Sequence, residues 1–225
     1  MKSQLRTSLY AILLMLLATV GYIVSCTQKD TLLVVPEPVV QSGNAKLDFI
    51  TDPKVSFDKA HSNVGWETAY LGGLSFLTGR FDTLGFTSFH FDEAVPANTS
   101  FEAWVWVNKV NTSEPGRDKG CLQTTFGVNT GMTTEAANVA IVKSKSVVFN
   151  GDKGYTVKFD FTFHGVTKEL TGNFLYDGKL AAATRNTYGF SLYFQILAKT
   201  DFGIVSTNIA DLVTIKCNAI FRQNL

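Results

Sequence analysis

Residues 155–164 alternate between apolar and polar side chains with a period of two. Tyr155, Val157, Phe159, Phe161 and Phe163 fall on one face, and the positions between them carry Thr, Lys, Asp and Thr. Successive side chains of a strand point to opposite faces of a sheet, whereas a helix would spread these rings around its circumference. The segment therefore predicts a β-strand with one buried and one solvated face.

The same alternation recurs twice towards the C-terminus. Phe190, Leu192, Phe194, Ile196 and Ala198 share one face, as do Val213, Ile215, Cys217, Ala219 and Phe221. Other strand-like segments cover residues 54–59, 61–70, 74–81, 86–91, 101–110, 138–149 and 170–176, the last ending in a predicted turn at Asp177-Gly178. A short helix is possible around residues 118–126. About eight strands with hairpin-like spacing predict an all-β fold, an antiparallel barrel or sandwich, and closure is favoured because it leaves no open edge.

These apolar faces leave two alternatives for the interior. A barrel of about eight strands can be filled by its own side chains or leave room for one small ligand. In a filled interior, each buried Phe contributes about 1.5–3 kcal/mol without any ligand. In a hollow one, the candidate ligand-binding residues of the lumen are Phe159, Phe161, Phe163, Phe190, Leu192, Phe194, Ile196, Val213, Ile215 and Phe221.

The N-terminal segment has the pattern of an export signal. Lys2 and Arg6 precede a charge-free apolar run over residues 8–24, which is followed by Ser25-Cys26. Ile23-Val24-Ser25-Cys26 resembles the lipobox of bacterial lipoproteins, in which the cysteine is lipidated and becomes the first mature residue. Ile23 and Val24 depart from the usual Leu and small residue. The alternative is an uncleaved transmembrane anchor, for which the run is short.

This resemblance implies a lipoprotein signal peptide over residues 1–25, a flexible tether over residues 26–48 and a folded domain over residues 49–225. The tether is predicted from Pro36, Pro38 and the Gln41–Asn44 stretch. A lipidated Cys26 would anchor the chain to a membrane of the cell envelope, facing the periplasm or lying on the outer-membrane surface.

Charge and composition narrow the function classes. The chain has 225 residues, 45% of them hydrophobic, which suffices for one domain with a sizeable core. Its formal net charge is +1, and removal of Lys2 and Arg6 with the signal gives +1 − 2 = −1. No Lys/Arg run is present, so a nucleic-acid partner is not expected. In an export compartment Cys121 and Cys217 could form a disulfide, although Cys217 also fits as a free buried thiol.

Four segments of the chain together resemble the bacterial YceI-like family of lipid- or polyisoprenoid-binding proteins. The first runs from His61-Ser62-Asn63-Val64-Gly65-Trp66 to Thr78-Gly79-Arg80-Phe81, and the second is Arg117-Asp118. The third is Phe163-His164-Gly165-Val166-Thr167-Lys168, and the fourth is Thr200-Asp201-Phe202-Gly203-Ile204. The resemblance spans residues 54–222, and its strength lies in the order of the four segments.

The resemblance implies an extended, lipocalin-like antiparallel β-barrel whose apolar lumen holds a long isoprenoid or other lipid chain, such as a quinone-like or polyprenyl molecule. The chain differs from the family's motifs at two places, and both differences bear on which ligand is bound and on the shape of the barrel opening. Lys119-Gly120-Cys121-Leu122 stands where the family has His-Leu after Arg-Asp, and the family's Tyr-Pro is missing from residues 130–142.

Catalytic and metal chemistry is not expected. His61, His90 and His164 do not lie at metal-ligand spacing, so no metal site is predicted, and no nucleophile elbow, zinc-protease motif or phosphate loop occurs. We expect His164 to end its strand and donate within the following turn, and Asp201 to accept turn amide hydrogens. Arg117 with Asp118 and Arg80 with Asp82 are expected to be structural ion pairs or turn anchors.

Two hypotheses follow. In the first, the protein is a membrane-anchored, non-enzymatic binding protein that transports, stores or sequesters an amphiphilic or isoprenoid-type lipid. In the second, it is a structural or interaction module of the cell envelope with a solid core, whose outer face carries Trp104 and Trp106 for a partner. A homodimer is possible in either case, and no cofactor other than a bound lipid is expected.

Overall fold

A computed structural model describes residues 43–120, 138–151 and 154–225. In chain order the strands are β1 (Lys46–Asp48), β2 (Val55–Phe57), β3 (Asn63–Tyr70), β4 (Ser75–Phe81), β5 (Leu84–Asp92), β6 (Ser100–Trp106), β7 (Val110–Asn111), β8 (Val139–Gly151), β9 (Gly154–Phe163), β10 (Val166–Ala181), β11 (Arg185–Leu197) and β12 (Ile209–Asn224). One short helix, α2 (Pro115–Gly120), and four 3₁₀ turns, η1 (Lys59–His61), η2 (Leu71–Gly73), η3 (Pro96–Asn98) and η4 (Val107–Lys109), complete the described elements.

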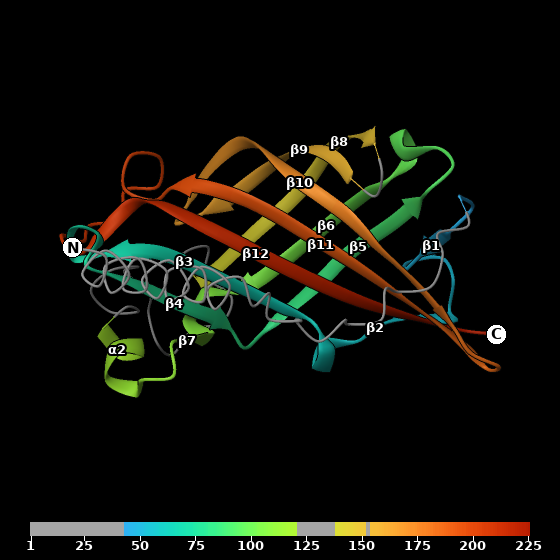
Figure 1. Cartoon of the computed structure of the whole chain (residues 1–225), viewed down its shortest axis with the longest axis horizontal. Helices are drawn as coiled ribbons and strands as arrows, with labels where there is room; N and C mark the ends of the chain where they lie inside the picture. Colours follow the sequence, from blue (N-terminus) through green and yellow to red (C-terminus); the bar gives the residue numbers. More distant parts are fainter. Residues whose placement is uncertain (1–42, 121–137, 152–153) are drawn as a thin grey trace, which may run out of the picture. The chain divides into compact units, whose positions relative to one another are not determined.

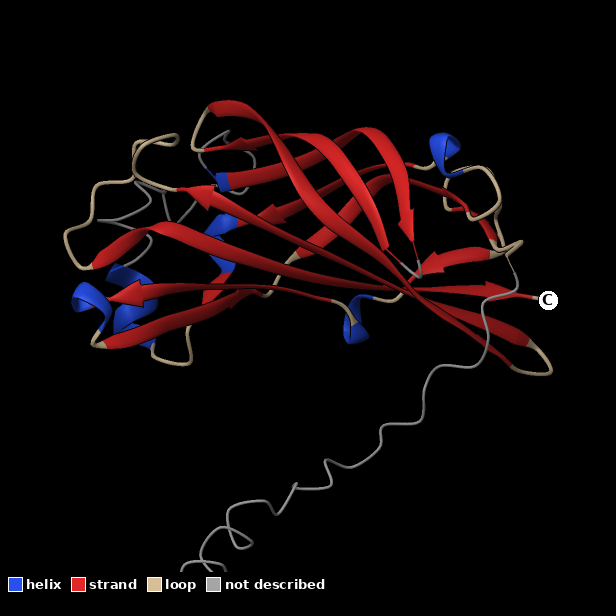
Figure 2. Cartoon of the chain, turned by 45° about the horizontal axis from the view of Figure 1, so that its top comes forward, coloured by secondary structure: helices blue, strands red, loops and turns tan. Residues whose placement is uncertain are grey.

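All described pairings are antiparallel and belong to one sheet, whose order is β1-β5-β6-β8-β9-β10-β11-β12-β3-β4-β7, with β2 added to β12 (Figure 1). Short turns join β9 to β10 and β10 to β11, whereas residues 198–208 connect β11 to β12. Figure 2 shows the strands of the curled sheet in red and these connections in tan. The predicted all-β antiparallel class is therefore confirmed.

The two ends of this order are connected through the segment 100–111. Its β6 part pairs with β5 at Leu84↔Val105, and its β7 part pairs with β4 at Phe81↔Val110. Between them, the amide of Asp82 donates to the carbonyl of Lys109 at 2.9 Å, and the amide of Trp106 donates to the carbonyl of Thr83 at 3.0 Å. β4 with β5, and β6 with β7, thus behave as two bent strands. The twelve described strands then count as 12 − 2 = 10, more than the expected eight, and the short strands β1 and β2 account for the difference.

The alternation in β9 is observed as expected. Its burial pattern repeats every two residues, with Tyr155, Val157, Phe159, Phe161 and Phe163 all buried. β11 and β12 likewise bury the predicted faces, with Phe190, Phe194 and Phe221 among the least exposed side chains. The period-two pattern therefore fixed both the element type and the buried face of these strands.

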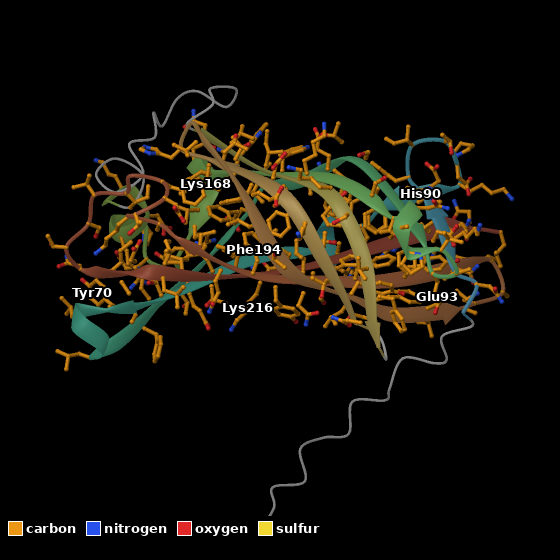
Figure 3. All side chains as sticks on the ribbon, turned by 90° about the horizontal axis from the view of Figure 1, so that it is seen from above. Tyr70, His90, Glu93, Lys168, Phe194 and Lys216 are labelled. Atoms are coloured by element: carbon orange, nitrogen blue, oxygen red, sulfur yellow. The ribbon has the colours of Figure 1, made fainter. Side chains whose placement is uncertain are left out.

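One end of the barrel interior is filled with stacked aromatic rings. Phe190 lies 4.9 Å from Phe91, 4.8 Å from Phe89 and 5.3 Å from Tyr176, measured between ring centroids. Phe221 adds a stacked contact of 4.3 Å with Phe89. Such pairs contribute about 0.5–1.5 kcal/mol beyond their buried area. This aromatic cluster lies beside His90, which Figure 3 labels at the end of the molecule opposite Tyr70.

Three expectations about local structure were wrong. Lys46–Asp48, placed in the tether, forms β1, and Ala45 and Leu47 are buried, so the folded region begins before residue 49. Asp177-Gly178 is not a turn but an irregularity within β10, which continues to Ala181. The short helix begins earlier than expected, at Pro115, and residues 121–126 of the expected helix lie outside the described residues.

Candidate functional site

An apolar cavity of about 320 Å³ lies inside the barrel. Its walls come from β3, β4, β5, β6, β8, β9, β10, β11 and β12. Its lining includes Val64, Trp66, Leu77, Leu84, Val105, Phe161, Phe194, Ile196 and Ile215. A volume of this size falls at the lower end of ordinary ligand pockets, which measure roughly 300–1,000 Å³. The aromatic cluster thus occupies one part of the interior, and the cavity occupies another.

Most of the predicted lumen residues line this cavity. They are Phe161, Phe163, Phe190, Leu192, Phe194, Ile196, Val213 and Ile215. Phe159 and Phe221 do not. Phe159 is fully buried and packs edge-on against Phe194 at 5.0 Å, and Phe221 belongs to the aromatic cluster. Alternation identifies the inward face of a strand, but it does not tell how deep into the packed end a given side chain lies.

The sequence reading missed the contribution of the first strands. Val64, Trp66, Thr68 and Tyr70 of β3 all line the cavity, as do Leu77 and Phe81 of β4. The sequence pattern that could have identified them is the same alternation, because these residues also recur with a period of two. Trp66 is 8% exposed, and its indole Nε1 is buried without a hydrogen-bond partner.

The end of the cavity away from the aromatic cluster reaches solvent. Among the described lining residues, Arg117 and Asn208 are the exposed ones. The carbonyl of Asn208 accepts a hydrogen bond of 2.8 Å from the amide of Leu71, which joins the turn between β3 and β4 to the loop before β12. Figure 1 shows α2 at the same end of the barrel as this turn. We call this end, defined by Tyr70, Arg117 and Asn208, the mouth.

Arg117 is the one charged residue among the described residues that line the cavity. Its Nε donates to the hydroxyl of Thr112 at 2.9 Å, and its Nη2 donates to the carbonyl of Thr112 at 2.6 Å. The carboxylate of Asp118 accepts from the amide of Thr112 at 2.7 Å. Of the two expected alternatives, ion pair or turn anchor, Arg117 and Asp118 show the second, because both bond to Thr112. Arg80 and Asp82 do form the expected ion pair, at 3.1 Å.

Burial favours the neutral forms of two titratable side chains in the interior, Cys217 and Tyr176. Burial raises the pKa of the Cys217 thiol, which lines the cavity, to about 12. Burial also raises the pKa of Tyr176 in the aromatic cluster. Cys217 is a free thiol, and Cys121 lies outside the described residues. An interior of this kind suits an uncharged hydrocarbon chain and offers no activated nucleophile.

Two turn residues take other partners than expected. Asp201 forms an ion pair with Lys168 at 3.2 Å, and it is Asp211 that accepts amide hydrogens, from Lys199 at 2.7 Å and Thr200 at 3.1 Å. His164 has a positive φ of 51° beside Gly165, and its Nδ1 lies 2.9 Å from the carbonyl oxygen of Phe202 rather than bonding within its own turn.

Metal-binding clusters and membrane-spanning helices are both absent from the part of the chain that the structure describes. Within residues 43–120, 138–151 and 154–225, no cluster of three or more His, Cys, Asp or Glu side chains could bind a metal ion. Helices there are too short or too polar to cross a bilayer. The predicted lipidation site Cys26 lies outside the described residues.

Comparison with known proteins adds three findings. A family model described as a YceI-like domain matches residues 56–221. A UPF0312 protein of Vibrio parahaemolyticus is 32% identical over 129 residues, which are 57% of this chain and 62% of that protein. A UPF0312 protein of Vibrio cholerae is 30% identical over 149 residues, or 64% of this chain and 72% of that protein.

Solved structures show the same fold at low sequence identity. BcnA of Burkholderia cenocepacia has a TM-score of 0.58 at 17% identity, covering 73% of this chain and 99% of BcnA. A YceI protein of Campylobacter jejuni has a TM-score of 0.53 at 19% identity, covering 68% of this chain and 86% of that protein.

Proposed function

Because this chain belongs to the family of YceI-like domains, we propose that its barrel is a non-enzymatic binding protein for an amphiphilic, lipid-type molecule whose apolar chain occupies the cavity. The observation that carries this proposal is the cavity itself. It measures about 320 Å³, its lining is almost entirely aliphatic and aromatic, and it reaches solvent at the mouth. A core that is packed only by its own side chains would not leave an empty volume of this size.

The energetics of the cavity favour an apolar occupant. Water gains little in a cavity without polar partners, and engineered apolar cavities of about half this size stay dry and bind apolar guests. Each methylene transferred from water to such an interior contributes about 0.8 kcal/mol. Phe161, Phe194 and Ile215 would supply dispersion contacts along the chain of the ligand. Shape and burial therefore select the class of ligand, an acyl or isoprenoid chain.

We also propose a cargo and a location for this binding protein. An isoprenoid-type lipid, quinone-like or polyprenyl, is the expected cargo for transport, storage or sequestration. Lipidation at Cys26 would tether the domain to a membrane of the cell envelope, with the roughly 20 residues up to β1 as the connection. The proposal is supported by the order of residues in the sequence: an apolar run over residues 8–24, then Ser25-Cys26, then a stretch with Pro36 and Pro38.

One pair of variants tests lipid binding directly. Ile196 points into the cavity, and its neighbour Leu197 points outwards and is 40% exposed. Ile196→Trp should fill the cavity and remove a co-purifying lipid, whereas Leu197→Trp should keep it. The measurement is native mass spectrometry and lipid extraction of full-length protein purified from its host, with thermal unfolding to show that both variants fold. A wild-type protein that is ligand-free and binds none of a panel of long-chain lipids would remove the proposal.

A second candidate function is a protein-interaction module. Trp104 and Trp106 are half-buried and their rings lie 5.6 Å apart at an angle of 32°. However, the ring of Trp104 covers Gly85, and Trp104 also contributes to the cavity lining, so this pair is not simply a free outer patch. Because Trp104 lines the cavity and Trp106 does not, the test uses Trp106→Ser alone, which should abolish partner binding and leave lipid content unchanged if this second function holds.

A further inference from the structure

The single cation of an otherwise apolar cavity suggests what the ligand carries at its polar end. Arg117 lines the cavity at the mouth, and every other described lining residue is uncharged. We propose that Arg117 binds an anionic oxygen headgroup, a carboxylate or a phosphate, of the lipid whose chain fills the cavity. This rests on the proposed function and assigns the headgroup class that the apolar lining leaves open.

Arg117 is held in place by groups beneath it. Two of its N–H groups are used by Thr112, one on the hydroxyl and one on the carbonyl. Thr112 is only 6% exposed, and its hydroxyl is in turn fixed by the carboxylate of Asp118. A guanidinium that is already ordered loses less conformational freedom when it binds a ligand than a free surface arginine does. Its other N–H groups remain for a headgroup.

The guanidinium of Arg117 forms no ion pair among the described residues. No described carboxylate lies within ion-pair distance of the Arg117 guanidinium, whereas Lys216 pairs with Glu67 at 2.8 Å. The carboxylate of Glu114 accepts the backbone amide hydrogen of Arg117 instead. Asp118, the nearest acid in sequence, is engaged by Thr112. The positive charge at the mouth is therefore not neutralised by a direct pair among the described residues.

The chemistry of guanidinium favours an anion over a neutral polar group. Its planar fork matches the geometry of carboxylate and phosphate oxygens, and charge-assisted hydrogen bonds are about twice as strong as neutral ones. An alcohol or a hydrocarbon end gains less at this position. Because Arg117 is exposed, salt should weaken the interaction.

The test compares three molecules with the same chain and different ends: palmitate, hexadecyl phosphate and hexadecanol. Their affinities for the full-length protein are measured at neutral pH by displacement of an apolar fluorescent probe. We expect wild type to bind the two anions about tenfold more tightly than the alcohol, since charge-assisted hydrogen bonds are stronger than neutral ones but are screened at an exposed site. The preference should shrink at high salt, while alcohol binding should not.

Arg117→Gln should bring the three affinities within about twofold of one another, and Arg117→Lys should retain part of the anion preference because it keeps the charge but not the fork. Lys119→Gln is the matched control, since Lys119 is an exposed cation on the same helix but does not line the cavity. It should behave as wild type. The stronger of the two anions would tell a fatty-acid-like ligand from a phosphorylated lipid.

Failure of this proposal differs from failure of the proposed function. If wild type binds all three molecules equally, or if the preference survives in Arg117→Gln, the Arg117 site is wrong while lipid binding stands. If none of the three displaces the probe and none binds on direct titration, it is the binding function that fails.

Discussion

The indole of Trp66 lies across the Cα of Gly79, so closely that a Cβ at position 79 would stand 2.5 Å from Cζ2 and 2.9 Å from Nε1 of the ring. The two residues face each other across the β3–β4 pairing. A side chain at position 79 would therefore displace a ring that forms part of the cavity wall.

We expect Gly79→Ala to lower the free energy of unfolding by about 1–3 kcal/mol, the usual effect of forcing atoms into a packed site. Gly65→Ala is the control, because its Cβ would meet neighbours only at ordinary contact distances of 3.6 Å or more. Urea denaturation measures both. Adding Trp66→Phe to Gly79→Ala should restore part of the loss, and the absence of any rescue would argue against the ring contact as the cause.

Phe91→Ala should be among the most destabilising single changes in the domain. Phe91 is fully buried and contacts Tyr176 and Phe190, each with a centroid distance of 4.9 Å. Removal of such a ring leaves a cavity and costs about 3–5 kcal/mol. Phe76→Ala, at a position that is 75% exposed, should change stability by less than about 0.5 kcal/mol. Equal effects of the two changes in chemical denaturation would contradict the packing described for the aromatic cluster.

Acid should weaken the loop before β12 through Asp211. The hydroxyl and amide of Thr200 and the amide of Lys199 donate to this carboxylate and lower its pKa below the ordinary 3.8. Because the folded-state pKa is the lower one, the stabilisation is present above the unfolded pKa near 3.8 and is lost as pH falls through the folded value.

Asp211→Asn should accordingly reduce stability at pH 7, and its difference from wild type should shrink below about pH 4. Asp201→Asn, which breaks only a partly exposed ion pair with Lys168, should have a small effect at pH 7. Urea midpoints at pH 7 and pH 3 measure both variants. A difference for Asp211→Asn that stays constant over this range would contradict the role of the charged form.

The thiol of Cys217 should react slowly in the folded protein. Burial of the thiol raises its pKa to about 12, so the thiolate is scarce at pH 8, although the residue as a whole is half-buried. In a chain with Cys26→Ser and Cys121→Ser, we expect a thiol reagent to label Cys217 much more slowly in buffer than in urea. Since Cys217 lines the cavity, a bound lipid should slow the reaction further. Labelling at the unfolded rate in buffer would show that the interior is open to water.

The strands that could be predicted from the sequence are those in which apolar and polar residues alternate. In β9, β11 and β12 the period of two located the strands and their buried faces, because both depend only on neighbouring positions. The irregularity at Asp177-Gly178 was mistaken for a turn, since Asp-Gly is a common turn sequence and only the partner strand shows that β10 continues.

The mouth could not be predicted from local patterns. Arg117 and Asp118 were interpreted as a structural ion pair or as turn anchors, and nothing in the adjacent residues reveals that α2 lies against a cavity formed by distant strands. Phe159 and Phe221 show the same limit. The sequence correctly predicted that both side chains point inwards, but other rings pack around them, so they do not line the cavity.

The rings around Phe190 close one end of the barrel, which makes the cavity a blind-ended tube. A long molecule would have to enter tail-first through the mouth and leave by the same route, head-first. Each added carbon should then improve affinity only until the terminal methyl touches Phe190. Beyond that length, surplus carbons would protrude and contribute nothing, so a plot of affinity against carbon number should rise and then level off.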